Sequence, residues 1–321
     1  MVLVGTGDFE PAALTALVRE TFGDMARPRE AIPARDEGKL DARAVRAGVF
    51  RIGGAGSAST EAASVAPLPL RPDSREVHVE RQKREFVMGV FAQRLKTEIN
   101  AGAGADASYD ELLGHGVAMA TVTVPAREWG TGVRSLDQMV RLTLERGLDP
   151  SDIDTARRQQ LRVTSHMLDQ LPTLDPGMLC EALTDSITGH TVFAGIEQKF
   201  TWMREWLERF TPAEAQQVFR GLWVPANMAF HVAGGVDIEL TGDKIVQEVQ
   251  KNRRTGLASV MPRQHRDTPF TLPRFGPPTD VAERRELPQL GARLLRFGNN
   301  VRVNFVANRQ EPGLVRVLVR V

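Results

Sequence analysis

The chain has 321 residues, of which 42% are hydrophobic and 25% charged, and its formal net charge is +1. This composition is typical of a globular protein with one large or two ordinary domains, and the near-neutral charge gives no electrostatic reason to expect nucleic acid or a membrane surface as a partner. No apolar run approaches the roughly 20 residues needed to cross a bilayer. The single cysteine, Cys180, excludes an internal disulfide and a zinc cage built from cysteines. Its neighbours Leu179 and Leu183 favour a buried, inert thiol.

The N-terminal residues predict a strand, a glycine turn and a helix. Met1–Val4 are apolar, Pro11 suits the first turn of a helix, and Gly23 suits its end. Residues 27–46 are charged, with few large apolar side chains, and predict a surface connector.

Two strands are expected next, at residues 49–52 and 61–70. Pro67 and Pro69 lie in the second and cannot donate hydrogen bonds to a neighbouring strand. This strand should therefore lie at a sheet edge or end early. The sequence GGAGSAS at 53–59 predicts a flexible loop and lacks the lysine of a phosphate-binding loop.

Residues 86–158 predict the layer around which the rest of the chain is organised. An amphipathic helix, a Gly/Ala hinge, a strand at 117–124 and two more helices follow one another. Gly147 should end the first of those two helices, and Asp149-Pro150 should begin the second.

Three further helices and a strand are predicted after this layer. The helices cover residues 174–188, residues 195–210 and a segment that opens at Thr211, where the hydroxyl and the Glu214 carboxylate can cap each other's backbone amides. A strand is expected at 227–236.

A weak internal repeat links the two ends of this region. Residues 1–8 and 228–237 both read as an apolar strand, a glycine turn and an aspartate, and a helix follows each, the second at 243–249. Such a repeat predicts a duplicated α+β half-domain.

The C-terminal part predicts a linker and the start of another domain. Prolines are dense and periodicity is absent over residues 252–290, whereas residues 291–321 predict a hairpin that turns at 298–300 and one more strand at 316–321. Because both ends of the chain read as strands that need neighbours, we expect a piece of a longer protein.

The sequence predicts no metal site. Its histidines are scattered without ligand spacing, at positions 78, 115, 166, 190, 231 and 265. The run His78-Val79-Glu80 is half of a deaminase motif, but the paired cysteines are missing, so a solvated histidine is the favoured interpretation. His231 alternates within a strand, which favours a hydrogen-bonded sheet histidine. Neither the zinc-binding motif H-E-x-x-H nor its inverse, H-x-x-E-H, occurs in the sequence.

Nucleotide-binding and nucleophilic sites are also weakly indicated. Gly5 and Gly7 resemble the start of a dinucleotide fingerprint, but Glu10 replaces the third glycine, so a tight turn is favoured. Ser165 and His166 are neighbours on a helix and point apart.

Three aromatic residues could contact a ligand or pack against other side chains. Trp202 and Trp206 share a helix face with core residues, so packing is favoured. Tyr109, the only tyrosine, follows the Gly/Ala hinge; packing at the surface is favoured there over contact with a ligand.

In their order and spacing, these segments resemble the pitrilysin/insulinase family of zinc metallopeptidases. The resemblance is carried by a "G-D-F" turn with a helix ending in "F-G-D", by an "R-L" helix and its loop, by a strand–helix–turn–helix unit, by the strand that closes it, and by a final hairpin. These lie at residues 1–25, 91–110, 121–161, 225–238 and 296–321.

The resemblance implies an α+β fold, with an antiparallel sheet and helices packed on one face. Residues 1–251 would be the non-catalytic half of a first repeat, 252–290 an interdomain linker and 291–321 the first strands of the next repeat. The family binds zinc through H-x-x-E-H, whose glutamate is the general base. No position of this sequence matches that motif, so no catalytic, cofactor-binding or metal-binding residue is predicted.

The implied function is a non-catalytic wall of the substrate chamber in a bacterial, periplasmic or secreted zinc endopeptidase. Zinc is expected in the parent protein and not in this segment, and the partners would be the other halves of that protein and its peptide substrate. Two alternatives stay open. One is a scaffold or binding subunit from a catalytically dead relative. The other is a nucleotide-binding module at Gly5 and Gly7, which requires a parallel sheet.

Overall fold

The computed structural model describes residues 3–25, 44–69, 71–99, 104–112, 114–169, 171, 175–189, 191–237, 239–255, 257, 279–306 and 317–318. The chain divides into two units, Met1–Ser259 and Val260–Val321, and each is described by itself.

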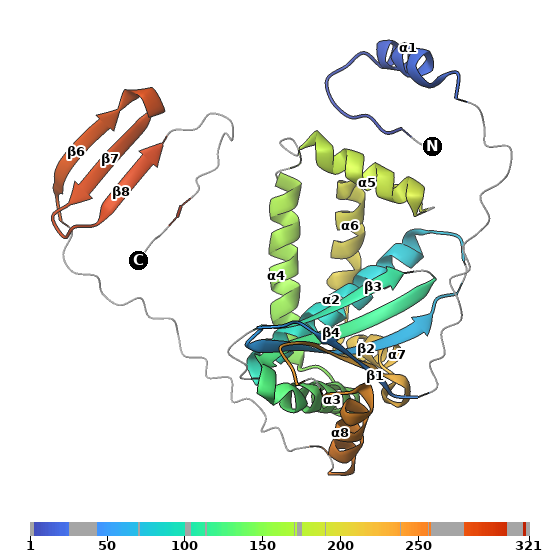
Figure 1. Cartoon of the computed structure of the whole chain (residues 1–321). Helices are drawn as coiled ribbons and strands as arrows, with labels where there is room; N and C mark the ends of the chain where they lie inside the picture. The colour runs from blue at the N-terminus through green and yellow to red at the C-terminus, as the bar shows by residue number, and fades with distance from the viewer. Residues whose placement is uncertain are drawn as a thin grey trace. The chain divides into compact units, whose positions relative to one another are not determined.

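A five-stranded mixed sheet is the centre of the first unit (Figure 1). Its strands are β1 (Arg46–Arg51), β2 (Ser57–Pro67), β3 (Ala105–Leu112), β4 (His115–Pro125) and β5 (Ala229–Gly234). Their order across the sheet is β1-β5-β2-β4-β3. Neighbouring strands are antiparallel except β1 and β5, which run parallel with Arg46 opposite Ala229.

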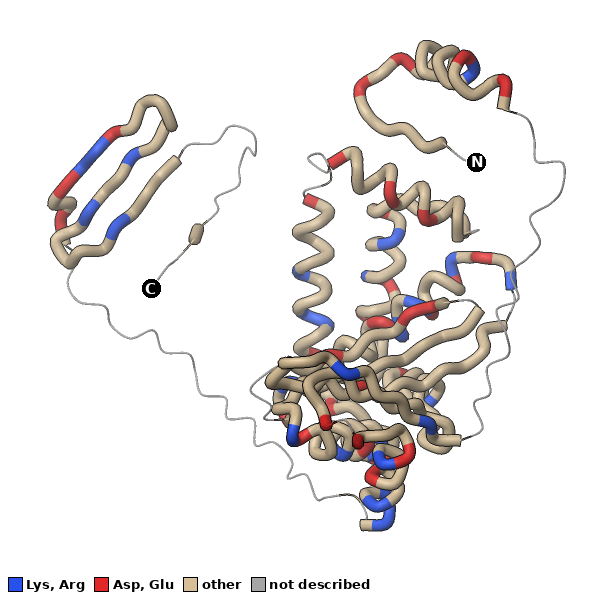
Figure 2. The backbone as a smooth tube through the Cα atoms, in the orientation of Figure 1, with Lys and Arg blue, Asp and Glu red and all other residues tan. Residues whose placement is uncertain are grey.

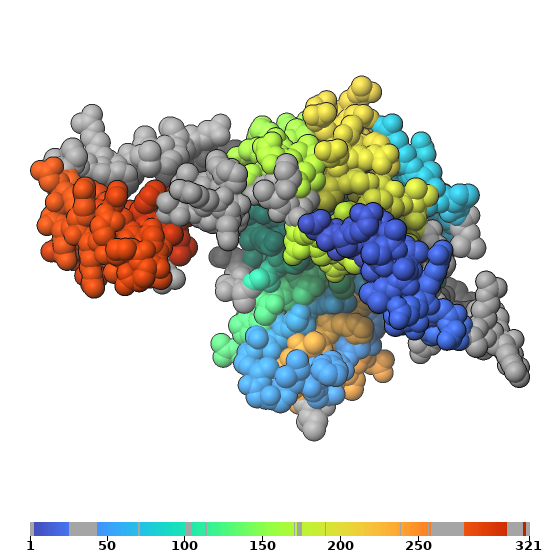
Figure 3. All heavy atoms as spheres, turned by 90° about the horizontal axis from the view of Figure 1, so that it is seen from above, coloured from blue at the N-terminus to red at the C-terminus, as the bar shows by residue number. Residues whose placement is uncertain are grey.

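Eight helices accompany the sheet in the described part of this unit. They are α1 (Pro11–Phe22), α2 (Arg75–Glu98), α3 (Trp129–Arg146), α4 (Pro150–Asp169), α5 (Pro176–Thr188), α6 (Ile196–Leu207), α7 (Pro212–Leu222) and α8 (Gly242–Arg254). Helices α2, α3, α7 and α8 contact the sheet, while α4 and α6 contact α2. In Figure 3, α6 lies beside the first turns of α2.

The helices pack against one face of the sheet because that face carries small side chains. Ala58, Ala62, Ala118 and Ala120 are buried there and let the helices approach closely. Gly132 of α3 comes so near to β2 that an added Cβ would lie 2.5 Å from the Thr60 hydroxyl oxygen. Charged residues of both signs lie mainly on the helices, and the central strands are mostly uncharged (Figure 2).

An aromatic cluster fills the space between the helices and the sheet. The Phe91 ring in α2 lies 5.0 Å from that of Phe219 in α7 and 6.2 Å from that of Trp223, centroid to centroid. All three side chains are buried. Such edge-on aromatic pairs add to the stability that burial of apolar area already supplies.

The predicted α+β class, with helices on one face of a sheet, is confirmed. The sheet is mixed and not purely antiparallel, because β1 and β5 run in the same direction. A parallel pair needs a long crossover, and residues 52–228, about two thirds of the unit, lie between these two strands.

The strand predictions were partly correct. β2 ends early, at Pro67, which is one of the two outcomes expected for it; it lies between β4 and β5 and begins at Ser57, inside the segment expected as a flexible loop. β3 occupies residues expected to follow a hinge as a loop. The N-terminal copy of the internal repeat is not seen, since Leu3 and Val4 lie outside any strand, and Met1 falls outside the described residues.

The described part of the second unit is a three-stranded antiparallel sheet in the order β6-β7-β8. Its strands are β6 (Val281–Leu287), β7 (Ala292–Phe297) and β8 (Arg302–Val306). The predicted hairpin is β7–β8, and Asn300 in its turn has a φ of 67°. β6 lies inside the segment expected as a linker, so regular structure begins earlier there. Most of the strand expected at 316–321 lies outside the described residues.

Candidate functional site

One face of the five-stranded sheet has no helix packed on it in the described part of the chain. We call the side chains on it the open face. Alternate strand residues point to this face, and each of them is partly or fully exposed, whereas their neighbours along β2, β4 and β5 are mostly buried. The open face consists of Arg46, Gly48, Phe50, Ser59, Glu61, Ala63, Val65, Asp106, Ser108, Asp110, Val117, Met119, Thr121, Thr123, Ala229, His231 and Ala233.

Two ionisable side chains lie together on the open face. His231 of β5 is opposite Glu61 of β2, and its Nδ1 lies 3.8 Å from the Glu61 Oε1. On its other side the imidazole lies across Gly48 of β1, where an added Cβ would be 2.6 Å from two ring atoms. The imidazole is 65% exposed and the Glu61 side chain 31%, so both are accessible from solvent.

The middle of the open face is otherwise uncharged, whereas its two edges carry Arg46 on β1 and Asp106 and Asp110 on β3. Alanine, valine, threonine and methionine side chains cover β2, β4 and β5, and Phe50 at the edge is 69% exposed. Such a surface suits an extended polypeptide, which presents alternating side chains to a sheet. His231 and Glu61 can hydrogen-bond or pair with polar groups of the peptide.

The structure offers no evident metal centre in the residues it describes. No group of three His, Cys, Asp or Glu side chains there is arranged to hold a metal ion. His190 and His265 lie outside the described residues. His166 and Ser165 are both exposed on α4, as expected for neighbours that point apart.

His78 differs from its predicted solvated state. Its side chain is only 12% exposed, its Nε2 lies 3.4 Å from the Asp73 carboxylate, and its ring lies 5.7 Å from that of Trp202. The residue therefore helps join the start of α2 to α6. The alternation of apolar and charged residues around it gave no sign of this packing, which depends on a helix more than a hundred residues later.

Trp206 and Cys180, two further candidates from the sequence, have structural roles. Trp206 packs edge-on against Phe86 and donates its indole hydrogen to the Gln82 side-chain oxygen, so the predicted packing role holds. The Cys180 sulfur is partly buried and lies 3.5 Å from the carbonyl oxygen of Val4.

The Gly5 and Gly7 turn does not follow a strand in the described residues. Thr6 between them donates to the carbonyl oxygen of Pro176. The strand–turn–helix arrangement of a dinucleotide site is therefore not formed by the residues that the structure describes here.

Tyr109 is buried, contrary to the prediction of a surface residue. It lies on β3 beneath α2, donates a hydrogen bond to the Glu111 carboxylate at 3.1 Å, and has the Arg84 guanidinium over its ring. Burial raises the pKa of its hydroxyl to about 12, with the Glu111 carboxylate adding to the shift and Arg84 opposing it. Arg81 and Arg84 both pair with Glu111, so this network fastens α2 to the edge of the sheet.

Comparison with solved structures identifies the architecture. The fold is that of insulinase-type protease domains. The periplasmic protease PqqL from Escherichia coli matches 95% of the chain with a TM-score of 0.66 at 15% sequence identity. The first half of PqqL, solved separately, matches 79% of it with a TM-score of 0.65 at 14% identity.

A predicted insulinase family protease from Yersinia pestis matches 77% of the chain with a TM-score of 0.61, again at 14% identity. The chain spans 34% of the length of PqqL, 56% of its solved first half and 54% of the Yersinia protein. No protein-family model matches the sequence, and no curated protein matches it.

At these identities the similarity shows the fold, and the resemblance inferred from sequence is confirmed at that level. No helix in the described ranges is long and apolar enough to cross a membrane.

Proposed function

We propose that this chain is a non-catalytic part of an insulinase-type zinc endopeptidase, in which the open face forms part of the wall of the chamber that holds the peptide. The observation that carries the proposal is the fold, which matches about a third of PqqL along nearly the whole of this chain. The open face supports it, because a sheet surface whose middle carries mostly small uncharged side chains can contact many peptide sequences.

In this proposal the zinc and its general base belong to another part of the parent protein. The partners of the chain are the remaining halves of that protein and the peptide substrate. Residues 1–251 would form the non-catalytic half, 252–290 the connection and 291–321 the beginning of a further repeat. PqqL is described as periplasmic, and we propose a periplasmic or secreted location for the parent.

The first test is the metal content and activity of the purified chain. We expect far less than one zinc ion per chain by elemental analysis and no cleavage of an unstructured fluorogenic peptide. Cleavage should occur when the chain is expressed together with the remainder of its reading frame, and a chelator should stop it. One zinc ion per chain, or chelator-sensitive cleavage by the chain alone, would contradict the proposal.

The second test concerns the open face itself. In the active parent protein, Met119→Asp should raise KM for peptide, because the substitution places a charge in the middle of the surface that the peptide contacts. The matched control is Gln247→Asp on α8, at an exposed position away from the sheet. An equal effect of both substitutions would show that the open face does not contact the substrate.

The reading frame on the 5′ side of the Met1 codon separates the proposal from the scaffold alternative. We expect it to encode H-x-x-E-H. Its absence throughout the parent protein would identify a non-catalytic scaffold or binding protein.

A further inference from the structure

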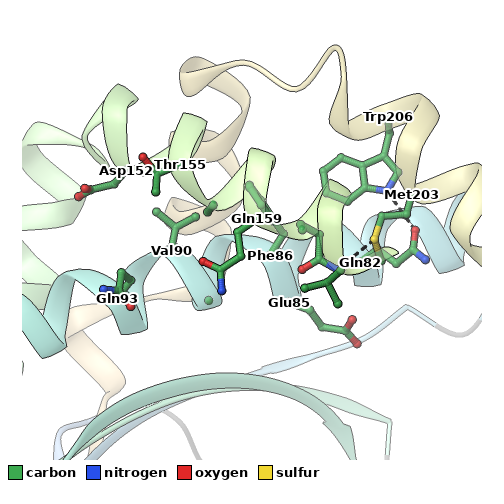
Figure 4. Close-up of a pocket in the computed structure, with 14 residues that line it drawn as sticks. Gln82, Glu85, Phe86, Val90, Gln93, Asp152, Thr155, Gln159, Met203 and Trp206 are labelled. Atoms are coloured by element: carbon green, nitrogen blue, oxygen red, sulfur yellow. Dashed lines mark hydrogen bonds between the residues drawn. The ribbon is translucent and has the colours of Figure 1, made fainter. Parts of the chain in front are cut away.

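A groove on the helical side of the first unit has features of a ligand site. It lies between α2, α4 and α6, encloses a volume of about 420 Å³, and is shown in Figure 4. This volume falls within the range of small-molecule sites, roughly 300–1,000 Å³. The groove is on the opposite side of the sheet from the open face, so it does not depend on the proposed peptidase function.

Carboxylates are the only charged groups that line the groove. Glu85 of α2 and Asp152 of α4 lie at opposite ends of it, and no lysine, arginine or histidine lines it. From Glu85 to Gln93, the last α2 residue that lines the groove, the helix rises about 12 Å at 1.5 Å per residue.

These two carboxylates differ from Glu80 and Glu111, the acidic groups that face arginines of α2. Glu80 and Glu111 both form ion pairs with arginines, whereas no ion pair joins Glu85 or Asp152 to another residue in the described part of the chain. Although Glu85 as a residue is exposed, the protein around its carboxyl group desolvates it and raises its pKa, which Arg81 opposes.

Between the two ends the lining is apolar and amide-bearing. Phe86, Val90 and Trp206 supply apolar surface, and the side chains of Gln82, Gln93 and Gln159 supply amides. The indole of Trp206 is held by its hydrogen bond to Gln82, at 3.0 Å, so the ring is fixed before a ligand arrives. Methylene groups can pack on these surfaces, and the amide oxygens can accept hydrogen bonds from ammonium groups.

Gly89 leaves open space against α2 in this groove. It lies in the interior of a 24-residue helix and lines the groove, and an added Cβ would meet no atom within 4 Å. Glycine in the interior of a helix is less favourable than alanine, and nothing in the described protein uses the space it leaves. The space is therefore free for a ligand against the helix backbone.

We propose that this groove binds a linear polyamine, with one terminal ammonium group at Glu85, the other at Asp152, and the methylene chain on Phe86 and Trp206. An alkylammonium chain with charges at both ends matches two separated carboxylates, an apolar middle and neutral amides. An anionic ligand would meet only carboxylate charges, and a neutral apolar ligand would leave both carboxylates without a partner.

The test is calorimetric titration of the 321-residue chain with spermidine at low salt. We expect saturable binding of one spermidine per chain. Hydrogen bonds to charged groups are strong enough that Glu85→Gln and Asp152→Asn should each weaken binding by about tenfold or more. Gly89→Leu should block the groove and abolish binding. The shorter 1,4-diaminobutane should bind more weakly, because it cannot reach both carboxylates.

Glu145→Gln is the matched control, because Glu145 is an exposed carboxylate on α3 outside the groove. It should leave the affinity unchanged, and circular dichroism should show the same helix content in every variant. Absence of spermidine binding to the wild-type chain would overturn the proposal. So would equal weakening by Glu145→Gln, which indicates non-specific attraction, or binding of a lysine-rich peptide but not of spermidine.

Discussion

His231 on β5 lies directly across Gly48 on the parallel strand β1, and its imidazole fills the space that a side chain at position 48 would need. Glycine destabilises a strand. It is nevertheless found at position 48 because the neighbouring imidazole occupies the space of a larger side chain. The two residues are therefore coupled, although they are far apart in the sequence.

This coupling predicts that the effect of Gly48→Ala on stability depends on the residue at position 231. In the wild-type chain Gly48→Ala should give little or no gain in the free energy of unfolding, because the imidazole must rotate away. In a His231→Ala background the same substitution should stabilise by about 0.5–1 kcal/mol, since alanine is better than glycine in a strand. Urea unfolding of the four proteins in the cycle measures the coupling. Equal effects in both backgrounds would show that the ring does not occupy this space.

Two helical glycines should respond in opposite ways to alanine. Gly132→Ala places a methyl group against the buried Thr60, whose hydroxyl donates to the Val122 carbonyl oxygen, and should destabilise by about 1–3 kcal/mol. Gly89→Ala faces open space and should stabilise by about 0.5–1 kcal/mol. Each variant is the control for the other in urea unfolding. A stabilising Gly132→Ala would contradict the close approach of α3 to β2.

Asp137 joins α3 to α8 and should be sensitive to substitution. Its fully buried carboxylate pairs with Arg141 and Arg253 and accepts a hydrogen bond from Asn252 at 3.0 Å. Removing one member of a buried ionic network leaves charges without compensation, so Asp137→Ala should cost about 3–5 kcal/mol. The exposed Asp243→Ala on α8 should cost less than about 1 kcal/mol. Similar losses in chemical denaturation would contradict the network's importance.

Tyr109 should titrate late and make the folded state less stable at high pH. Its pKa is raised to about 12 in the folded chain, whereas an unfolded tyrosine titrates near 10. Above pH 10 the unfolded state therefore binds fewer protons than the folded state, and stability falls until the pH passes the folded value. Because this is the only tyrosine, tyrosinate absorbance reports it alone. In urea the transition should move to about pH 10, and Tyr109→Phe should remove it.

Local signals predicted the helices well because helix ends are encoded by neighbouring residues. Thr211 and Glu214 form the expected reciprocal cap of α7, with the Glu214 amide 3.2 Å from the threonine hydroxyl. Gly147 ends α3 with a φ of 85°, a value that glycine adopts readily.

The strands were harder to predict because their partners are distant. β3 contains Asp106, Asp110 and Glu111 and looks like a loop, yet pairing with β4 and burial of Tyr109 make it a strand. The parallel pairing of β1 could not be predicted from its six residues, because its partner β5 lies near the end of the unit.

Separation along the sequence also explains why the candidate sites could not be predicted. His231 was recognised as a sheet histidine, but Glu61 and Gly48 reach it only through strand order and register. The groove between α2, α4 and α6 brings together three helices, and no spacing within one helix specifies the other two. Gly89, a glycine inside a 24-residue helix, is the one local signal of this groove in the sequence of α2.

The parallel pairing of β1 with β5 also bears on how the chain is made. The ribosome releases β1 early, whereas its partner strand β5 emerges only after nine further α-helices and strands have been synthesised. Until then β1, with the exposed Phe50, is a strand edge open to pairing with other molecules. A truncation that stops translation before Ala229 should therefore yield an aggregating product and not a smaller soluble domain.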